Sequence, residues 1–411
     1  MTTPPPPSTP PGPRSTAALL RDRTFGPWFF GNAVSNSGNW LFNVTAAVVV
    51  YRLSGSALLV GLVSVAQFGP LLLFSPLGGA LSDRVDRRRL LLTSQSAAAA
   101  AATALAVAAV WWGVDAMPGA WPILAAAFGI GLGQAVSAPT LNALVPALVD
   151  DADLEGAVAL TSLTFNLGRA LGPATAGVLL ATLGAELAFV INAVTFLVLI
   201  GALLVIRPRP REEHRDRDRS VRAGLRHVRS EPGLLLLLGG VAATGFAADP
   251  MITLAPALAE AVGGGDALAA GLVSAFGVAA VPAAAMSGPL QRRIGSLEVA
   301  TGGCTVVAAG LLVSAISPAA WVAVAGFGLT GVGFVLALTG FTTVLQRRVP
   351  DRLRGRVMAL WSVAFLGNRP VAALIDGAAA DLVGPRWAMG VAITVALLGA
   401  LVGVRLQRRR A

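Results

Sequence analysis

Four charged side chains stand inside otherwise apolar stretches of the chain: Arg169, Asp249, Arg369 and Asp376. A charge at the centre of a bilayer costs about 3 kcal/mol even on the lenient insertion scale, so each of the four needs a reason. A carboxylate that binds a proton in one conformation, and an arginine or a substrate in another, shifts the populations of the two conformations. These four residues are therefore candidates for proton coupling, and a static ion pair is the alternative interpretation.

Uncharged polar side chains also recur at helical spacing. Asn32, Asn36, Asn39 and Asn43 fall at i, i+4, i+7 and i+11, which places them on one helix face. Further polar positions that share such stripes, or that a neighbouring helix adds, are Ser162 and Asn166 with Arg169, Ser362 with Arg369 and Asp376, and Gln134. A polar stripe cannot face lipid, so it lines a water-filled cavity or makes tight helix contacts. We predict a cavity, with interhelical hydrogen bonding as the alternative.

The usual constellations of catalysis and metal binding do not occur in the sequence. The two histidines, His214 and His227, lie in one charged segment, and the single cysteine, Cys304, lies in an apolar run. These residues cannot build a metal site. No triad of nucleophile, base and orienting residue occurs, and neither does a phosphate-cradling loop. We expect no cofactor, no metal and no enzymatic activity.

The composition indicates which elements must hold the polar residues. The 411 residues are 55% hydrophobic and only 13% charged, whereas soluble domains carry about 25% charged residues. Lipid must therefore serve as the solvent for much of this surface. The net charge of +10 falls in short segments between apolar runs, which argues against a nucleic-acid-binding protein.

Apolar runs near the length of about 20 residues that a membrane-spanning helix needs occur twelve times. They cover residues 27–51, 57–80, 90–112, 121–148, 157–181, 185–206, 233–258, 267–290, 296–317, 321–345, 357–382 and 386–405. The predicted organisation is a disordered Pro-rich tail at 1–20, a six-helix bundle at 21–206, a cytoplasmic linker at 207–232, a second six-helix bundle at 233–405 and a tail at 406–411. The end of the linker, near 218–230, is a candidate amphipathic helix.

The arginines predict the orientation, because cytoplasmic loops carry an excess of Lys and Arg. The tails, the central linker and the connections on one side are rich in arginine, whereas the opposite connections offer only Arg52 and Arg386. We therefore expect a multi-pass protein of the cytoplasmic membrane with both termini in the cytoplasm.

An internal repeat relates the two halves. Residues 151–188 align with 351–388 without a gap, and nine of these 38 positions are identical, including Arg169 and Arg369. The two segments are the fifth and eleventh helices and run in the same direction, so the repeat is parallel. This predicts an all-α membrane protein of twelve transmembrane helices, built as two pseudo-symmetric six-helix bundles around a central cavity.

The segment after the second helix carries a family motif. It reads Gly79-Ala80-Leu81-Ser82-Asp83-Arg84-Val85-Asp86-Arg87-Arg88-Arg89 and resembles the loop 2–3 signature of the major facilitator superfamily, with Asp86 in place of its second glycine. That departure resembles the drug- and siderophore-exporter branch. The resemblance implies a latch of Gly79, Asp83, Arg84, Arg87 and Arg88, in which Asp83 faces the start of the eleventh helix and stabilises the outward-facing state. Positive-inside topology alone is the alternative reading of the arginines.

The fifth helix carries a second motif, in which Gly168, Gly172, Pro173 and Gly177 stand out. It resembles the antiporter signature of the superfamily, although the closing glycine is displaced by one residue. The resemblance implies export rather than uptake, and close helix packing is the alternative.

Together these features predict a secondary active transporter that exports a small organic molecule (a drug, a macrolide-like compound or a siderophore) by alternating access with proton antiport. A proton-coupled nutrient importer of the same fold and a non-transporting membrane scaffold are the alternatives. The expected partners are a small-molecule substrate, protons and the lipid bilayer, without nucleic acid, and we expect a monomer.

Overall fold

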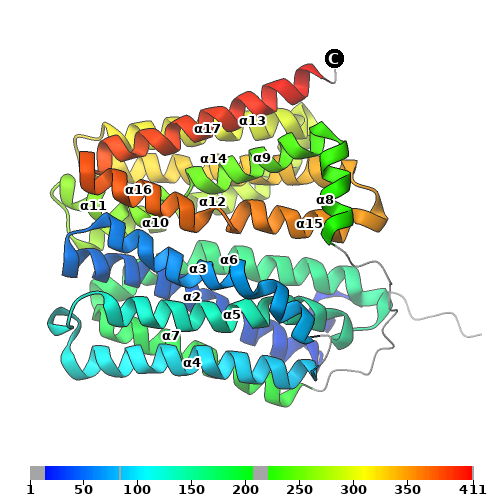
Figure 1. Ribbon diagram of the computed structural model, residues 1–411, viewed down its shortest axis with the longest axis horizontal. Helices are drawn as coiled ribbons and strands as arrows, with labels where there is room; N and C mark the ends of the chain where they lie inside the picture. Colours follow the sequence, from blue (N-terminus) through cyan, green and yellow to red (C-terminus); the bar gives the residue numbers. More distant parts are fainter. Residues whose placement is uncertain (1–13, 83–84, 207–220, 410–411) are drawn as a thin grey trace, which may run out of the picture.

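The computed structural model describes residues 14–82, 85–206 and 221–409, and the described chain is built of helices (Figure 1). Within these ranges, the side chains of several helical segments lie outside the description: 75–82, 139, 142–143, 162–163, 165–171, 173–174, 181, 221–224, 351–352 and 354.

Two helical bundles lie side by side (Figure 1). The first contains α2 (Phe25–Ser54), α3 (Ala57–Ser82), α4 (Arg87–Trp112), α5 (Trp121–Leu148), α6 (Leu154–Thr182) and α7 (Gly184–Val205). The second contains α9 (Pro232–Ala247), α10 (Pro250–Thr253), α11 (Ala255–Ala261), α12 (Asp266–Ile294), α13 (Ser296–Ala315), α14 (Ala320–Arg348), α15 (Asp351–Leu366), α16 (Arg369–Val383) and α17 (Pro385–Arg408). Short helices α1 (Thr16–Leu20) and α8 (Val221–Ser230) flank the bundles.

Ten stretches of the described chain are long and apolar enough to cross a membrane. The two remaining spans are α2, with 30 residues, and α6, with 29. Both are long enough to cross but are more polar, because they carry the stripes of amide and hydroxyl residues. The chain is thus an all-α membrane protein with twelve transmembrane segments in two six-segment bundles.

Two of the predicted spans are not continuous helices, which corrects the sequence-based expectation. The run 233–258 is divided into α9, α10 and α11, and the run 357–382 is divided into α15 and α16. Each of the three breaks lies no more than one residue before a proline: residues 248–249 before Pro250, residue 254 before Pro256 and residues 367–368 before Pro370. Proline has no N–H to donate, and its ring clashes with the carbonyl one turn earlier. Broken helices near the membrane midplane are a feature of transporter binding sites.

The bundles contact each other mainly through two helix pairs, α3 with α16 and α6 with α12. We call the end that holds the start of α2, the start of α4 and helix α8 the arginine-rich end, and the other the opposite end. The glycine contacts between the bundles lie toward the opposite end: Gly61 of α3 abuts the Ala373 carbonyl, and Gly177 of α6 abuts Ser274 and Ala270.

The predicted central linker is described only in its last part. Residues 207–220 lie outside the described residues, and α8 follows them at the arginine-rich end, where it packs on α15 and α9 (Figure 1). The linker thus ends in the helix that its charge pattern predicts. The remaining predicted domain boundaries stay predictions.

Candidate functional site

The asparagine stripe of α2 lies along a cavity of about 320 Å³. Asn32, Asn36, Asn39 and Asn43 all line it, and Gln134 of α5 joins them. On α2 the lining residues run from position 28 to position 43, which is about 22 Å along the helix at 1.5 Å per residue. The cavity therefore extends from near the arginine-rich end to the middle of the bundle.

The amides of the stripe also join helices. Asn32 Nδ2 donates to Thr164 Oγ1 at 3.3 Å, and Asn36 Nδ2 donates to the Thr164 carbonyl at 3.2 Å. Gln134 Nε2 donates to Asn39 Oδ1 at 2.8 Å. The stripe therefore fits both interpretations, a cavity and interhelical hydrogen bonding, because these amides line the cavity and also bridge α2 to α6 and α5.

The cavity has further polar lining residues, of which Gln67 and Gln95 were not singled out from the sequence. Gln67 of α3, Gln95 of α4 and Ser137 of α5 are buried, and Gln95 Nε2 donates to Ser137 Oγ at 2.9 Å. A glutamine inside an apolar span is itself a signal, since its amide cannot face lipid.

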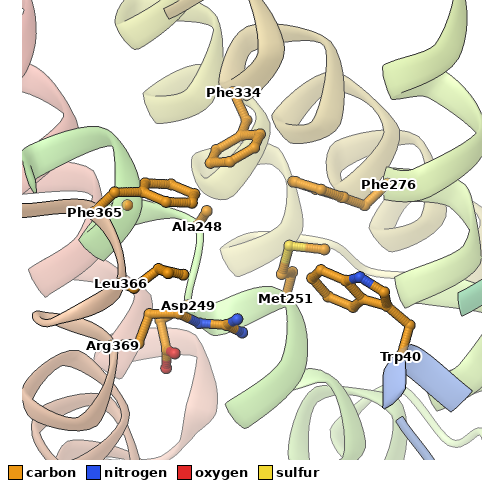
Figure 2. A pocket seen from close by; sticks show the side chains of 10 residues that line it. Trp40, Ala248, Asp249, Met251, Phe276, Phe334, Phe365, Leu366 and Arg369 are labelled. Atoms are coloured by element: carbon orange, nitrogen blue, oxygen red, sulfur yellow. The ribbon is translucent and has the colours of Figure 1, made fainter. Parts of the chain in front are cut away.

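The second bundle presents an aromatic wall to the centre. A smaller cavity of about 40 Å³ lies beside the first, and Figure 2 shows Phe276, Phe334 and Phe365 on one side of it with Trp40 and Met251 across from them. The ring centroids of Phe276 and Phe334 are 5.5 Å apart, and those of Phe334 and Phe365 are 6.1 Å apart. Arg369 and Trp40 line both cavities.

Arg369 stands where the two walls meet. It is the first residue of α16, and its guanidinium carbon lies 4.6 Å from the ring centroid of Phe68 and 5.8 Å from that of Trp40. Both distances fall in the range of a cation–π interaction. Among the described side chains it makes no direct ion pair, although Asp249 is close enough to act on it electrostatically.

Two aspartates are buried in this region, and one of them, Asp249, lies beside this arginine. Asp249 lies at the break between α9 and α10, where its Oδ2 accepts from Thr253 Oγ1 at 2.6 Å and its Oδ1 has no hydrogen-bond partner. Asp376 of α16 is 0% exposed, and neither of its carboxylate oxygens has a partner. The two carboxylates also act on each other electrostatically. Three carboxylate oxygens thus lie in the protein interior without a donor.

The remaining predicted polar residues divide into two groups. The side chains of Arg169, Ser162 and Asn166 lie outside the described residues, so their predicted roles stay predictions. Ser362 does not belong to the site: its side chain is exposed, its hydroxyl donates to the Met358 carbonyl, and it lines neither cavity. The reason is the break after Leu366, which interrupts the single helix that a seven-residue spacing from Ser362 to Arg369 presumes.

The predicted latch is only partly described. Asp83 and Arg84 lie outside the described residues, and Gly79 lies in the part of α3 whose side chains are not described. Arg88 donates to the last carbonyls of α7, from its Nε to Leu203 O at 3.0 Å and from Nη2 to Leu204 O. A cation there is favoured by the negative end of the helix dipole.

The residues beside Arg88 start the next helix. Asp86 is the N-cap of α4 and accepts from the Arg89 N–H at 2.8 Å. Aspartate is among the strongest N-cap residues. The described part of the motif, including Arg87 in the first turn of α4, therefore fixes how this helix begins. Its function as a latch stays a prediction.

The glycines of the antiporter-like motif mark close helix packing on two sides of α6. A Cβ on Gly172 would overlap Trp40 of α2, and one on Gly177 would meet Ser274 Oγ of α12 at 2.8 Å. Gly172 therefore lets α6 close on the cavity wall, and Gly177 lets it close on the other bundle. Gly168 and Pro173 lie in the part of α6 whose side chains are not described.

A polar cluster outside the spans fastens Arg14, the first described residue, to the first bundle. Arg14 Nε is 2.6 Å from Asp153 Oδ2, the Arg14 N–H donates to Asp153 Oδ1 at 2.7 Å, and Arg14 Nη1 is 2.9 Å from Asp22 Oδ2. The bonds from the Arg14 backbone and side chain lower the pKa of Asp153. Burial opposes the shift at Asp22, but hydrogen bonds from Thr24, Phe25 and Arg14 outweigh it and lower that pKa as well.

The described residues offer no cluster of three or more His, Cys, Asp or Glu side chains for a metal ion. The arrangement instead provides a cavity with an amide wall, a smaller aromatic cavity beside it, a guanidinium where the two meet, and two buried carboxylates. Such a site can bind a molecule of mixed polarity and can hold a proton.

Solved structures of several transporters share this fold. A bacterial homologue of the human lysosomal transporter Spinster, in an inward-facing and unoccupied conformation, matches with a TM-score of 0.73 at 14% identity, over 96% of this chain and 97% of that one. A bacterial homologue of the iron transporter ferroportin matches with a TM-score of 0.72 in its inward-facing state and 0.60 in its outward-facing state, at 15% and 17% identity. These two matches cover 96% and 93% of this chain and 99% of each of those. The TM-score is thus higher for the inward-facing than for the outward-facing structure of that homologue.

Sequence relatives and a family model give the family. The enterobactin exporter EntS of Escherichia coli O1:K1 and that of Shigella boydii serotype 4 are each 28% identical over 371 residues, which is 85% of this chain and 83% of the relative. The model of the transmembrane secretion effector family matches residues 14–411. With its twelve spans, its central cavity and its charged centre, the chain belongs to the transmembrane secretion effector family of the major facilitator superfamily.

Proposed function

We propose that this transporter exports a small organic molecule from the cytoplasm by alternating access, and that it works as a proton antiporter. The positive-inside rule places the arginine-rich end in the cytoplasm. The large cavity reaches the middle of the protein from that end, so a cytoplasmic molecule can enter it. The similarity to proteins named enterobactin exporters supports export rather than uptake.

The two neighbouring cavities, one lined by amides and the other by phenylalanines, favour a substrate of mixed polarity. The amides of α2, with Gln67, Gln95 and Gln134, offer both hydrogen-bond donors and acceptors. The phenylalanines of the second bundle offer an apolar face. A volume of about 320 Å³ falls within the range of small-molecule sites. We infer an amphipathic organic molecule that lies between the walls, with one edge at Arg369.

The coupling is inferred from the charges at the centre. Asp249 interacts electrostatically with both Arg369 and Asp376, and an unpaired buried charge is costly. A proton on one carboxylate leaves a single negative charge to balance Arg369. Asp249 lines the cavity beside Arg369, whereas Asp376 is fully enclosed. Asp249 is therefore the carboxylate that a substrate reaches, and Asp376 is the one that can keep a proton out of contact with water.

Antiport follows if substrate and proton compete at Asp249. A substrate that donates hydrogen bonds to the ionised carboxylate favours loss of the proton to the cytoplasm. After the outward transition, a proton from the other side displaces the substrate. Each ligand shifts the conformational equilibrium only by its difference in affinity for the two states. The observation that carries this mechanism is the set of three unpartnered carboxylate oxygens, one on Asp249 at the break between α9 and α10 and two on Asp376 within α16.

The direction of transport is tested in inside-out vesicles, in which the cytoplasmic face is outside. Radiolabelled enterobactin and a panel of fluorescent dyes serve as probes, with an imposed gradient that is acidic inside. We expect at least one probe to accumulate in vesicles that contain the protein and to be released by an uncoupler. Accumulation only under the reverse gradient, acidic outside, would establish proton symport, the coupling of an importer, instead.

A further inference from the structure

The two bundles are joined at the opposite end by a carboxylate that completes a helix of the other bundle. Asp381, near the end of α16, accepts from Ser56 Oγ at 2.6 Å, from the Ala57 N–H at 2.7 Å and from the Leu58 N–H at 3.3 Å. Ala57 is the first residue of α3. A side chain of the second bundle thus holds the N-terminus of a helix in the first.

This contact is an N-cap in its chemistry. The first N–H groups of a helix have no partner within the helix, and a carboxylate there is favoured by the positive end of the helix dipole. The hydroxyl of Ser56, the residue next to the helix, accepts from the Leu59 N–H at 3.2 Å. Asp381 stands 325 positions away from Ser56 in the sequence. The start of α3 is therefore fully capped only while the bundles touch.

A second polar contact crosses the same boundary. Arg52, in the last turn of α2, lies 3.2 Å from Asp266, the first residue of α12, between Nη1 and Oδ2. Its Nε lies 3.3 Å from Asp115 Oδ1 within its own bundle. One arginine thus has two carboxylate partners, of which only Asp266 has to separate from it when the bundles part at this end.

The backbones lie close together directly beneath these contacts. A Cβ on Gly61 would overlap the Ala373 carbonyl, and a Cβ on Gly377 would lie 2.5 Å from the Ala57 carbonyl oxygen. Below them lies a cavity of about 10 Å³, lined by Asn43, Ala47 and Arg369 among others. The bundles are therefore packed closely against each other between the polar contacts and the charged centre.

We propose that Asp381 and Arg52, with their partners Ser56, Ala57, Leu58 and Asp266, form an outer clasp that holds the inward-facing state, and that this clasp sets the balance between the inward- and outward-facing states. The inference builds on the alternating access proposed above. Opening to the outside separates Asp381 from α3 and Arg52 from Asp266. The N–H groups at the start of α3 then lose the carboxylate and are exposed to water.

The clasp is the counterpart of the latch predicted from the sequence. That latch places Asp83, which follows the other end of α3, against the start of the eleventh helix. The same antiparallel helix pair then carries one carboxylate contact at each end. When one bundle rocks against the other, one contact forms as the other breaks.

The test measures access from outside to the site beneath the clasp. Ala47, which is buried and lines the small cavity, is replaced by cysteine in a Cys304→Ser background. Right-side-out vesicles are treated with a membrane-impermeant maleimide, without substrate or pH gradient. We expect Asp381→Ala to raise the labelling rate about tenfold, the usual scale of losing a helix N-cap, and Ser56→Ala to raise it by less.

A matched pair of variants controls for general loosening. Asp266→Asn removes the partner of Arg52 in the other bundle, and Asp115→Asn removes its partner in the same bundle. We expect the first to raise the labelling rate several-fold and the second to leave it at the parent rate. Parent-rate labelling in Asp381→Ala and Asp266→Asn, or equal increases in the Asp266 and Asp115 variants, would overturn the proposal. Because no transport is measured, the proposed substrate and coupling can fail separately.

Discussion

The packing of α6 on α2 gives a sharp prediction for Gly172→Ala. The added methyl group would overlap Cβ of Trp40, lie 3.1 Å from its Cγ and lie 3.4 Å from the Ser37 carbonyl oxygen. Carbon atoms pack at about 3.5–4.0 Å, so α6 or Trp40 must move. Overpacking of this kind costs about 1–3 kcal/mol. We therefore expect the Tm of the purified protein to fall by several degrees.

The same substitution has an expected effect on transport. Trp40 lines both cavities and its ring stands beside Arg369, so a displaced Trp40 changes the substrate site. We expect a higher KM in vesicle transport. The matched control is Gly201→Ala in α7, where a Cβ meets no atom within 4 Å. If Gly172→Ala melts and transports like Gly201→Ala, the close approach of α6 to α2 is not present in the protein.

Two other predictions address the guanidinium and the chain start. Arg369→Lys keeps the charge but loses the planar group over Phe68. The KM in vesicle transport should rise about two- to thirtyfold, which corresponds to a lost cation–π interaction of about 0.5–2 kcal/mol. An unchanged KM would mean that stacking does not position this residue. The pKa values of Asp22 and Asp153 are lowered in the folded protein. The stabilisation that these carboxylates give to the folded state is therefore complete above the unfolded carboxylate pKa of about 4. It is lost as pH falls through the folded pKa. Hydrogen exchange of α1 should therefore be protected equally from pH 5 to 8, whereas Arg14→Gln should remove that protection throughout; a loss of protection already between pH 7 and 5 in the unmodified protein would contradict this assignment.

The spans and the amide wall could be predicted from the sequence, because each follows from local pattern. Apolar runs of sufficient length must cross the bilayer, and asparagines on one face of α2 cannot lie against lipid. The helix breaks could not be read in the same way. Pro250 and Pro370 stand at breaks, whereas Pro282 and Pro289 lie inside the continuous helix α12. Whether a proline ends a helix depends on what packs against it.

The contacts between the bundles could not be predicted from the sequence either. Asp381 and Asp266 stand at the ends of apolar runs and look like ordinary solvated carboxylates. Their partners, Ala57 and Arg52, lie far away in the chain. Arg88 illustrates the same limit, since its contact with the α7 carbonyls depends on how α4 lies on α7. Only the three-dimensional arrangement assigns these residues.

The central claim is that Asp249 and Asp376 couple protons to transport, and one measurement tests it directly. Gradient-driven accumulation and substrate exchange without a gradient are compared in the same proteoliposomes for Asp249→Asn, Asp376→Asn and the surface control Asp115→Asn. Neutral amides cannot release or take up the coupled proton, so both buried variants should lose uncoupler-sensitive accumulation, and Asp376→Asn should keep exchange. Asp115→Asn should behave as the unmodified protein. Uncoupler-sensitive accumulation at the unmodified level in both buried variants would contradict the account.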